Sequence, residues 1–131
     1  MKQDQLFKKG LKIRKAVLGK EYVERSLKNA DKYLMPMQEL ITKSAWGMVW
    51  SRPGLSRKMR SVTNIAVLVS RNMPEELELN IKAGLRNGLT KDEIVEVLLQ
   101  TAIFCGFPAA FKAFHVASKV FAEDDRPAKS K

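Results

Sequence analysis

The stretch that decides the fold is residues 90–122, TKDEIVEVLLQTAIFCGFPAAFKAFHVASKVFA. Thr90 and Glu93 stand at the spacing of a capping box, in which a hydroxyl and a carboxylate each accept a hydrogen bond from a free backbone amide at a helix start. The next twelve residues are apolar on most sides and stop at Gly106, which is followed two residues later by a proline. The stretch therefore predicts two consecutive helices joined at this glycine.

The second of these helices, from about residue 108 to 122, has an apolar stripe at intervals of three and four residues. Its members are Ala110, Ala113, Phe114, Ala117, Val120 and Phe121. A turn of about 100° per residue places His115 nearly opposite this stripe. Phe111 and Val116 are apolar but lie off it. On so small a protein, apolar residues beyond the core stripe suggest a surface covered by another subunit.

The same helical spacing recurs outward along the rest of the chain. It predicts helices over residues 3–18, 36–50, 56–71 and 74–86. Gly19, the Pro53-Gly54 turn and Asn87-Gly88 are the expected stops. The sequence has neither a 20–50-residue repeat nor a Gly/Ser or Pro-rich linker. We therefore expect one all-helical domain over residues 1–123, followed by a flexible tail, 124–131.

Composition excludes several classes of protein. With 131 residues, 45% apolar and 29% charged, the chain has the size and balance of one globular domain and not of a disordered chain. One cysteine and one histidine exclude a disulfide scaffold and a zinc site of the usual kind. No apolar run reaches the length of a transmembrane segment and the start lacks a secretory signal, so we expect a cytoplasmic protein.

The positive charge is unevenly distributed. Residues 1–60 hold 15 Lys/Arg and 5 Asp/Glu, whereas residues 61–131 hold 9 of each, so the front half carries the whole net charge of +10. Such an excess can attract a nucleic acid, an anionic membrane or a small anionic substrate, or it can simply belong to solvated helix faces. Without a zinc-finger spacing, an aromatic RNA-binding signature or an arginine-rich block, nucleic acid is the minor alternative.

An ordered set of short motifs resembles the carboxymuconolactone decarboxylase family over about residues 8–123. The motifs are Gln38-Glu39-Leu40-Ile41-Thr42, Ala45-Trp46-Gly47 with Trp50, Arg52-Pro53-Gly54-Leu55, Glu93 to Gln100, Cys105-Gly106-Phe107-Pro108-Ala109-Ala110 and Ala113-Phe114-His115. The resemblance implies a compact all-helical, alkylhydroperoxidase D-like fold without metal or organic cofactor. It also implies a homo-oligomer, often a hexameric ring, and removal of carbon dioxide from gamma-carboxymuconolactone in aromatic-acid degradation through the beta-ketoadipate route.

The chain departs from the family patterns at three positions. Peroxidase relatives use a Cys-x-x-Cys pair, but Cys105 is followed by Pro108, so a dithiol cycle within one chain is chemically impossible and a peroxidase is the weaker interpretation. Decarboxylases commonly have histidine where this chain has Asn80, and an acidic residue where it has Met48. Because asparagine cannot exchange a proton, the alternative is a family member that has lost catalysis and keeps a binding or structural role.

Loss of carbon dioxide requires stabilisation of an oxyanion and a source of a proton. His115 is the first candidate for proton transfer, because histidine ordinarily titrates near neutral pH. It could equally hold a backbone carbonyl at a subunit contact. Glu93 is the other candidate proton carrier and matches an acidic position of the family, although its place in the capping box already explains it.

Substrate binding has its own candidates. Arg52, Arg57 and Arg60 lie around the Pro53-Gly54 turn and could grip a carboxylate of a small anionic substrate, or could be solvated surface. We also expect Asn80, Trp46 and Cys105 at the substrate. The asparagine could orient a lactone oxygen, or it could form hydrogen bonds at a subunit interface. The tryptophan either lines a pocket or belongs to the core. The cysteine lies between apolar residues, which is more typical of a small buried hydrophobic residue than of a reactive thiol.

Overall fold

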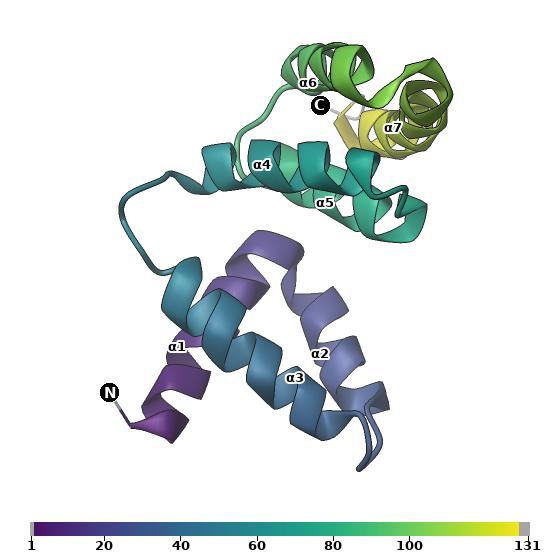
Figure 1. Cartoon of the computed structure of the whole chain (residues 1–131). Coiled ribbons are helices and arrows are strands. Elements are labelled where there is room, and N and C mark those ends of the chain that lie inside the picture. Colours follow the sequence, from purple (N-terminus) through teal and green to yellow (C-terminus); the bar gives the residue numbers. More distant parts are fainter. Residues whose placement is uncertain (1, 129–131) are drawn as a thin grey trace. The chain divides into compact units, whose positions relative to one another are not determined.

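The computed structural model of the chain describes residues 2–128, and their regular structure is entirely helical (Figure 1). Seven α-helices and one π-helix follow one another along this part of the chain. They are α1 (Gln3–Leu18), α2 (Lys20–Asn29), α3 (Met35–Ile41), the π-helix η1 (Thr42–Val49), α4 (Arg57–Ser70), α5 (Pro74–Arg86), α6 (Lys91–Cys105) and α7 (Phe107–Ala128). The predicted all-helical fold class is confirmed.

The helices form two compact units, Met1–Arg57 and Lys58–Lys131. The first contains α1, α2, α3 and η1, and the second contains α4 beyond its first residue together with α5, α6 and α7. Each unit buries apolar side chains of its own. The expectation of one domain over residues 1–123 stays a prediction.

In the first unit, α1 packs against the continuous helix that α3 and η1 form (Figure 1). Two glycines allow the backbones to approach closely. A methyl group at Gly10 would overlap the carbonyl oxygen of Thr42, and one at Gly47 would lie 2.8 Å from the carbonyl oxygen of Leu6. Both positions therefore require glycine because of the space between the helices.

Gly19 ends α1 as predicted and joins it directly to α2. Its φ of 101° is one that side-chain-bearing residues rarely adopt, and its amide donates to the carbonyl of Lys15 at 2.9 Å. The helix that follows, α2, was not singled out by the sequence analysis. Val23 on α2 is completely buried, so this helix is held by the core of the unit.

The predicted helix over residues 36–50 changes its winding near the middle. Residues Thr42–Val49 form a π-helix in place of an α-helix. At the transition, the hydroxyls of Thr42 and Ser44 donate to carbonyls four residues earlier, at 2.7 and 2.6 Å, a bond that bends helices. π-helical turns are rare, and they occur often at functional sites.

The second unit is built around one apolar core supplied by all four of its helices. Its buried members are Ile65, Val69, Leu77, Ile81, Leu89, Ile94, Leu98, Ala113, Ala117 and Val120. The predicted stripe on α7 faces this core, with Phe114 and Phe121 half-buried at its edge. However, α7 continues to Ala128, beyond the helix end predicted near residue 122, and the flexible tail over residues 124–131 stays a prediction. Residues 129–131 of that tail lie outside the described residues.

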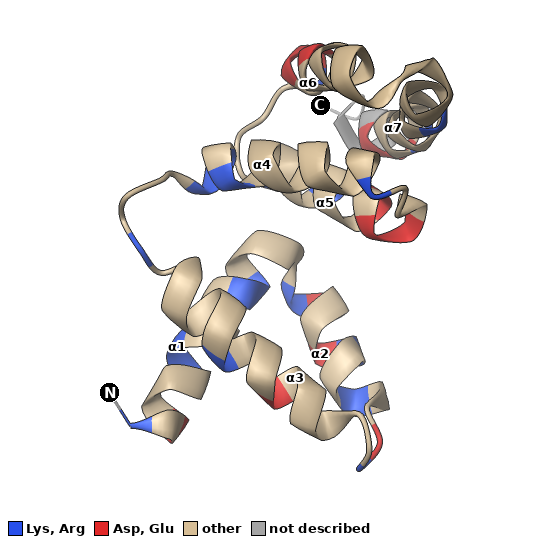
Figure 2. Ribbon diagram, viewed as in Figure 1, with Lys and Arg blue, Asp and Glu red and all other residues tan. Residues whose placement is uncertain are grey.

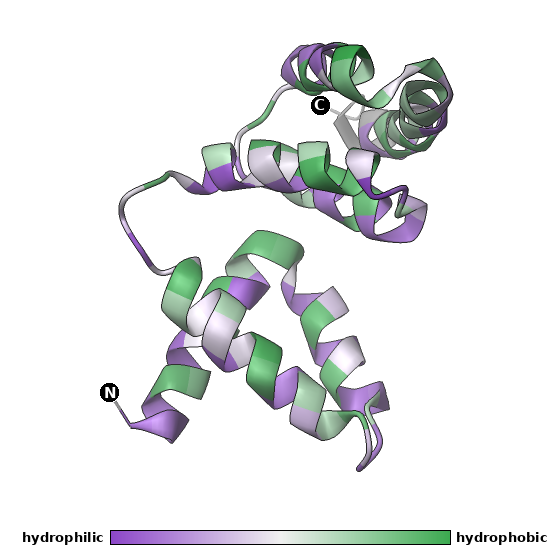
Figure 3. Ribbon diagram, in the orientation of Figure 1, coloured by the Kyte–Doolittle hydropathy of each residue, from purple (hydrophilic) through white to green (hydrophobic). Residues whose placement is uncertain are grey.

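A group of large apolar side chains is exposed where α6 and α7 meet, on ribbons that Figure 3 draws largely in green. We call this group the apolar corner, and its members are Leu99, Ile103, Phe104, Phe107 and Phe111. Phe104 is 84% exposed, which is unusual for phenylalanine. Between residues 2 and 128, no helix has both the length and the apolar character needed to cross a membrane.

Candidate active site

Glu93 is held at the head of α6 by two hydrogen bonds and one ion pair. The Thr90 amide donates to Glu93 Oε1 at 2.9 Å, and the Glu93 amide donates to the Thr90 hydroxyl at 3.0 Å, so the predicted capping box is present. The Lys58 ammonium lies 3.0 Å from Glu93 Oε2. The backbone bond from Thr90 first, and then Lys58, lower the pKa of Glu93 from its ordinary value. This carboxylate is therefore ionised at neutral pH.

A shallow groove of about 360 Å³ opens beside this carboxylate. Its lining is partly apolar, from Met59, Val62, Leu89 and Val97, and partly charged, from Lys58, Asp92, Glu93 and Glu96. A volume of this order accommodates a small organic acid. The groove thus places a fixed negative charge and a cation beside an apolar surface, within the second unit.

His115 lies on α7 opposite the buried stripe, as predicted, and is exposed. It does not belong to the lining of the groove beside Glu93. The two side chains proposed for proton transfer are therefore not brought together in that groove.

Asn80 on α5 is held by neighbours within the second unit. Its Nδ2 donates to the carbonyl of Glu76 at 2.9 Å, and its Oδ1 accepts from Asn64 Nδ2 at 3.1 Å. This amide thus links α5 to α4. It also lines a hollow with Arg71 and Met73, separate from the lining of the Glu93 groove.

The three predicted arginines are divided between the units. Arg52 and Arg57 belong to the first unit and are exposed, whereas Arg60 is half-buried in the second. Their convergence on one carboxylate stays a prediction. The cation that the structure does bring to Glu93 is Lys58, which lies in the same basic stretch and which the sequence analysis did not name.

Trp46 and Cys105 lie in different units. Trp46 is buried in η1 and its ring lies 4.9 Å from that of Trp50, centre to centre. The two rings therefore pack against each other within η1 and the residue that follows it. Cys105 is the last residue of α6, half-buried and not in a disulfide.

Arg14, on α1, is only 5% exposed, although nothing in the sequence pattern was taken to distinguish it from the lysines around it. Its Nη1 donates to Gln38 Oε1 at 2.8 Å and to Thr42 Oγ1 at 3.2 Å. Burial lowers the pKa of Arg14 from its ordinary value, and Tyr22 opposes this shift. Arg14 is the one arginine of α1, whose other cations are lysines. This difference is the signal that could have singled it out.

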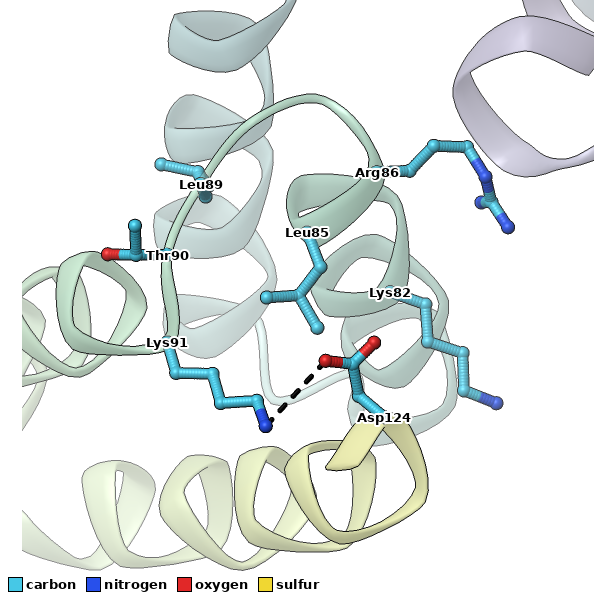
Figure 4. A pocket seen from close by; sticks show the side chains of 7 residues that line it. All are labelled: Lys82, Leu85, Arg86, Leu89, Thr90, Lys91 and Asp124. Carbon is cyan, nitrogen blue, oxygen red and sulfur yellow. Dashed lines mark ion pairs between the residues drawn. The ribbon is translucent and has the colours of Figure 1, made fainter. Parts of the chain in front are cut away.

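Other cations of the second unit line a hollow of about 490 Å³ (Figure 4). Its basic residues are Lys82, Arg86 and Lys91. Lys91 lies 3.6 Å from Asp124 across this hollow, and Lys82 lies 3.2 Å from Glu78. Because acidic neighbours already pair with these lysines, we do not assign the hollow to an anionic substrate.

Comparison with known proteins identifies the family. Residues 36–119 match the model of the Carboxymuconolactone decarboxylase family. The chain is 43% identical over 121 residues to the 4-carboxymuconolactone decarboxylase of Acinetobacter baylyi, covering 92% of this chain and 90% of that protein. It is 46% identical over 114 residues to the nitrosuccinic acid decarboxylase npaB of Metarhizium robertsii, covering 87% and 80%. From this evidence, the chain belongs to the carboxymuconolactone decarboxylase family.

Proposed function

We propose that this chain is a decarboxylase without metal or organic cofactor, which releases carbon dioxide from a small carboxylated compound. The family and two relatives named as decarboxylases support the reaction class. The observation that carries the proposal is the Lys58–Glu93 ion pair beside a groove with an apolar lining. A cation beside a low-polarity surface is the arrangement that stabilises a developing oxyanion.

The substrate class follows from the chemistry of the compounds in the relatives' names. Both 4-carboxymuconolactone and nitrosuccinic acid carry two carboxyl groups, of which one leaves and the other stays. We infer a small dicarboxylic acid as the substrate. Gamma-carboxymuconolactone, from the degradation of aromatic acids through the beta-ketoadipate route, is the first compound to test.

In this proposal the bond between the departing carboxylate and the adjacent carbon breaks, and its electron pair moves into a neighbouring carbonyl group. The Lys58 ammonium stabilises the oxyanion that forms, and the carbon then receives a proton. Glu93 is a poor proton donor because its lowered pKa keeps it ionised. Its role is to position Lys58, whose ammonium supplies the proton. His115 is the alternative donor.

The test is carbon dioxide release from gamma-carboxymuconolactone by the purified protein. We expect Lys58→Met to lower kcat/KM about 100-fold, since one stabilising donor is worth this order of rate. Lys82→Met is the matched control, because Lys82 is about as exposed as Lys58 and pairs with Glu78 on its own helix. This substitution should leave turnover unchanged. Wild-type rates in Lys58→Met would contradict the mechanism. Loss of carbon dioxide release in His115→Ala would identify His115 as the proton donor.

The exposed cations favour a second candidate, a family member that has lost catalysis and binds an anionic surface. In Figure 2, cations recur along α1 and α2. The exposed ones are Lys8, Lys9, Lys12, Lys20, Arg25 and Lys28. A protein that releases no carbon dioxide, even as Asn80→His, and binds anionic vesicles in a salt-dependent manner would support this candidate.

We further propose that the protein is a cytoplasmic homo-oligomer, with a hexameric ring as the expected form. The apolar corner supports self-association, since its five large side chains are all half-exposed or more. A single chain rarely leaves so many large apolar side chains together in water. A second copy of the same surface would cover them symmetrically.

A further inference from the structure

The groove beside Glu93 is open to water. The side chains of Lys58 and Glu93 are 43% and 44% exposed, and Met59 on the same lining is 48% exposed. Because water screens a charge, an ammonium exposed to this degree stabilises an oxyanion only weakly. Closing a site and expelling its water strengthens the same interaction. The groove is therefore incomplete as one copy of the second unit presents it.

One face of α6 leads from this groove to the apolar corner. Glu93, Val97, Gln100 and Phe104 follow at intervals of four, three and four residues, so they lie on one side of the helix. We call these four residues the α6 strip. Glu93 and Val97 line the groove, Gln100 is exposed, and Phe104 is the most exposed member of the corner, with Ile103 at its side. The groove and the corner are thus the two ends of one exposed surface.

The two ends of this surface carry opposite charge. The groove end is acidic, since its charged residues are Lys58, Asp92, Glu93 and Glu96. Residues 97–122 include no aspartate or glutamate, and the exposed Lys112 follows the apolar corner on α7. If two copies pack with their α6 helices antiparallel, the acidic end of each lies toward the basic end of the other. Such charge complementarity favours a second copy of this chain as the partner.

The middle of the strip is suited to a twofold axis. A residue at such an axis meets its own copy. Gln100 occupies this place, and a neutral amide can both donate to and accept from another amide. A charged side chain at the same position would face a like charge. The strip therefore has a self-complementary centre between its two unlike ends.

We propose that a second copy of the chain closes the groove, with its α6 packed antiparallel on this one about a twofold axis at Gln100. Four residues separate Gln100 from Phe104 in one direction and from Glu96 in the other. Phe104 of each copy therefore lies at the level of Glu96 in its partner and covers the rim of the groove. The inference rests on the proposed function, because the cover excludes water from the Lys58–Glu93 pair. Each pair of copies then contains two shared sites.

Coexpression of two impaired variants tests whether Phe104 acts in the partner. Phe104→Ala should lower kcat/KM about tenfold or more, because water then reaches Lys58. Phe104 is 84% exposed, so the substitution leaves the fold of one copy intact. In a mixed pair with Lys58→Met, the groove that keeps Lys58 is covered by Phe104 of the other chain. Random pairing should restore about a quarter of the wild-type rate.

The same experiment can overturn the proposal. If Phe104 serves the groove of its own chain, coexpression gives no more than the mean of the two variants assayed separately. Tyr33→Ala is the matched control, because Tyr33 is 79% exposed and lies in the first unit. This variant should keep the wild-type rate by itself.

A disulfide tests the arrangement without any activity. In a Cys105→Ser background, Gln100→Cys places one thiol of each copy at the axis, close enough to be joined. Diamide oxidises the two thiols to a disulfide and is itself reduced, so we expect a band of twice the chain mass on a non-reducing gel. Ser70→Cys in the same background, exposed at the end of α4, should stay at the mass of one chain. No cross-link in Gln100→Cys overturns the antiparallel arrangement.

The shared site and the proposed function fail separately. A Gln100→Cys cross-link without carbon dioxide release from any dicarboxylate keeps the interface between copies and removes the decarboxylase. Carbon dioxide release that is unchanged in Phe104→Ala keeps the decarboxylase and removes the shared site.

Discussion

The ammonium of Lys58 lies 3.0 Å from the Glu93 carboxylate and so joins the first turn of α4 to the first turn of α6. Both side chains are more than two-fifths exposed, and exposed ion pairs add little to stability. The importance of this pair is therefore chemical. The ion pair keeps the Lys58 ammonium in one position at the groove, whereas a flexible lysine side chain would otherwise sample many positions.

The charge of Glu93 predicts a pH dependence of stability. Because folding lowers the pKa of Glu93 from its ordinary value of 4.5, its contribution is fully present above that value and is lost as the pH falls through the folded-state pKa. Urea unfolding at pH 7 should show Glu93→Gln to be less stable than wild type, and the difference should shrink at about pH 3. Glu96→Gln, an exposed neighbour, is the control, and equal behaviour of the two variants would contradict the prediction.

The capping box predicts a specific cost for losing the Thr90 hydroxyl. Thr90→Ala removes the acceptor for the Glu93 amide and should lower the free energy of unfolding by about 1 kcal/mol. Thr63→Ala is the matched control, because Thr63 is exposed in the middle of α4 and its hydroxyl bonds only to the carbonyl one turn earlier among the described contacts. Chemical denaturation measures both. Equal losses in the two variants would argue against the cap.

The contact between α1 and η1 predicts that Gly10 tolerates no side chain. A methyl group there would overlap the Thr42 carbonyl and lie 2.9 Å from the Gly47 amide nitrogen. Because both obstacles are backbone, Gly10→Ala should destabilise the protein by about 3 kcal/mol. Gly54→Ala meets nothing within 4 Å and should be nearly neutral. Thermal unfolding compares them, and a stable Gly10→Ala would show that the helices can separate without cost.

The apolar corner predicts that charge disrupts self-association. Phe104→Lys places an ammonium at its most exposed side chain, so we expect the mass in sedimentation equilibrium to fall toward that of one chain of 14.8 kDa. Tyr33→Lys changes an aromatic residue of similar exposure in the other unit. It should leave the mass unchanged. If the oligomer persists in Phe104→Lys, the interface between copies lies on another surface.

The helix boundaries were predictable because they depend on short-range chemistry. Gly19 and Gly106 end helices with positive φ, Pro74 begins α5, and Thr90 caps α6, all as the sequence indicated. Each of these effects involves residues within one turn of the chain.

The winding of residues 42–49 was not predictable, because apolar residues at these spacings fit an α-helix and a π-helix equally well. Arg14 was missed for a related reason, since a cation in a lysine-rich helix is expected to face water. Its burial depends on Gln38 and Thr42, which lie more than twenty residues away. The pairing of Lys58 with Glu93 likewise needs the packing of α4 against the start of α6.

The connection at residues 50–56 has a consequence for how unfolding must be followed. Each of the two units has a buried core of its own, so their melting need not be one cooperative transition. Emission from Trp46 and Trp50 reports only on Met1–Arg57, whereas helical circular dichroism reports on every helix. Coincident curves would show that the units unfold together, and separated curves would assign a midpoint to each, as native-state hydrogen exchange does for independently opening segments.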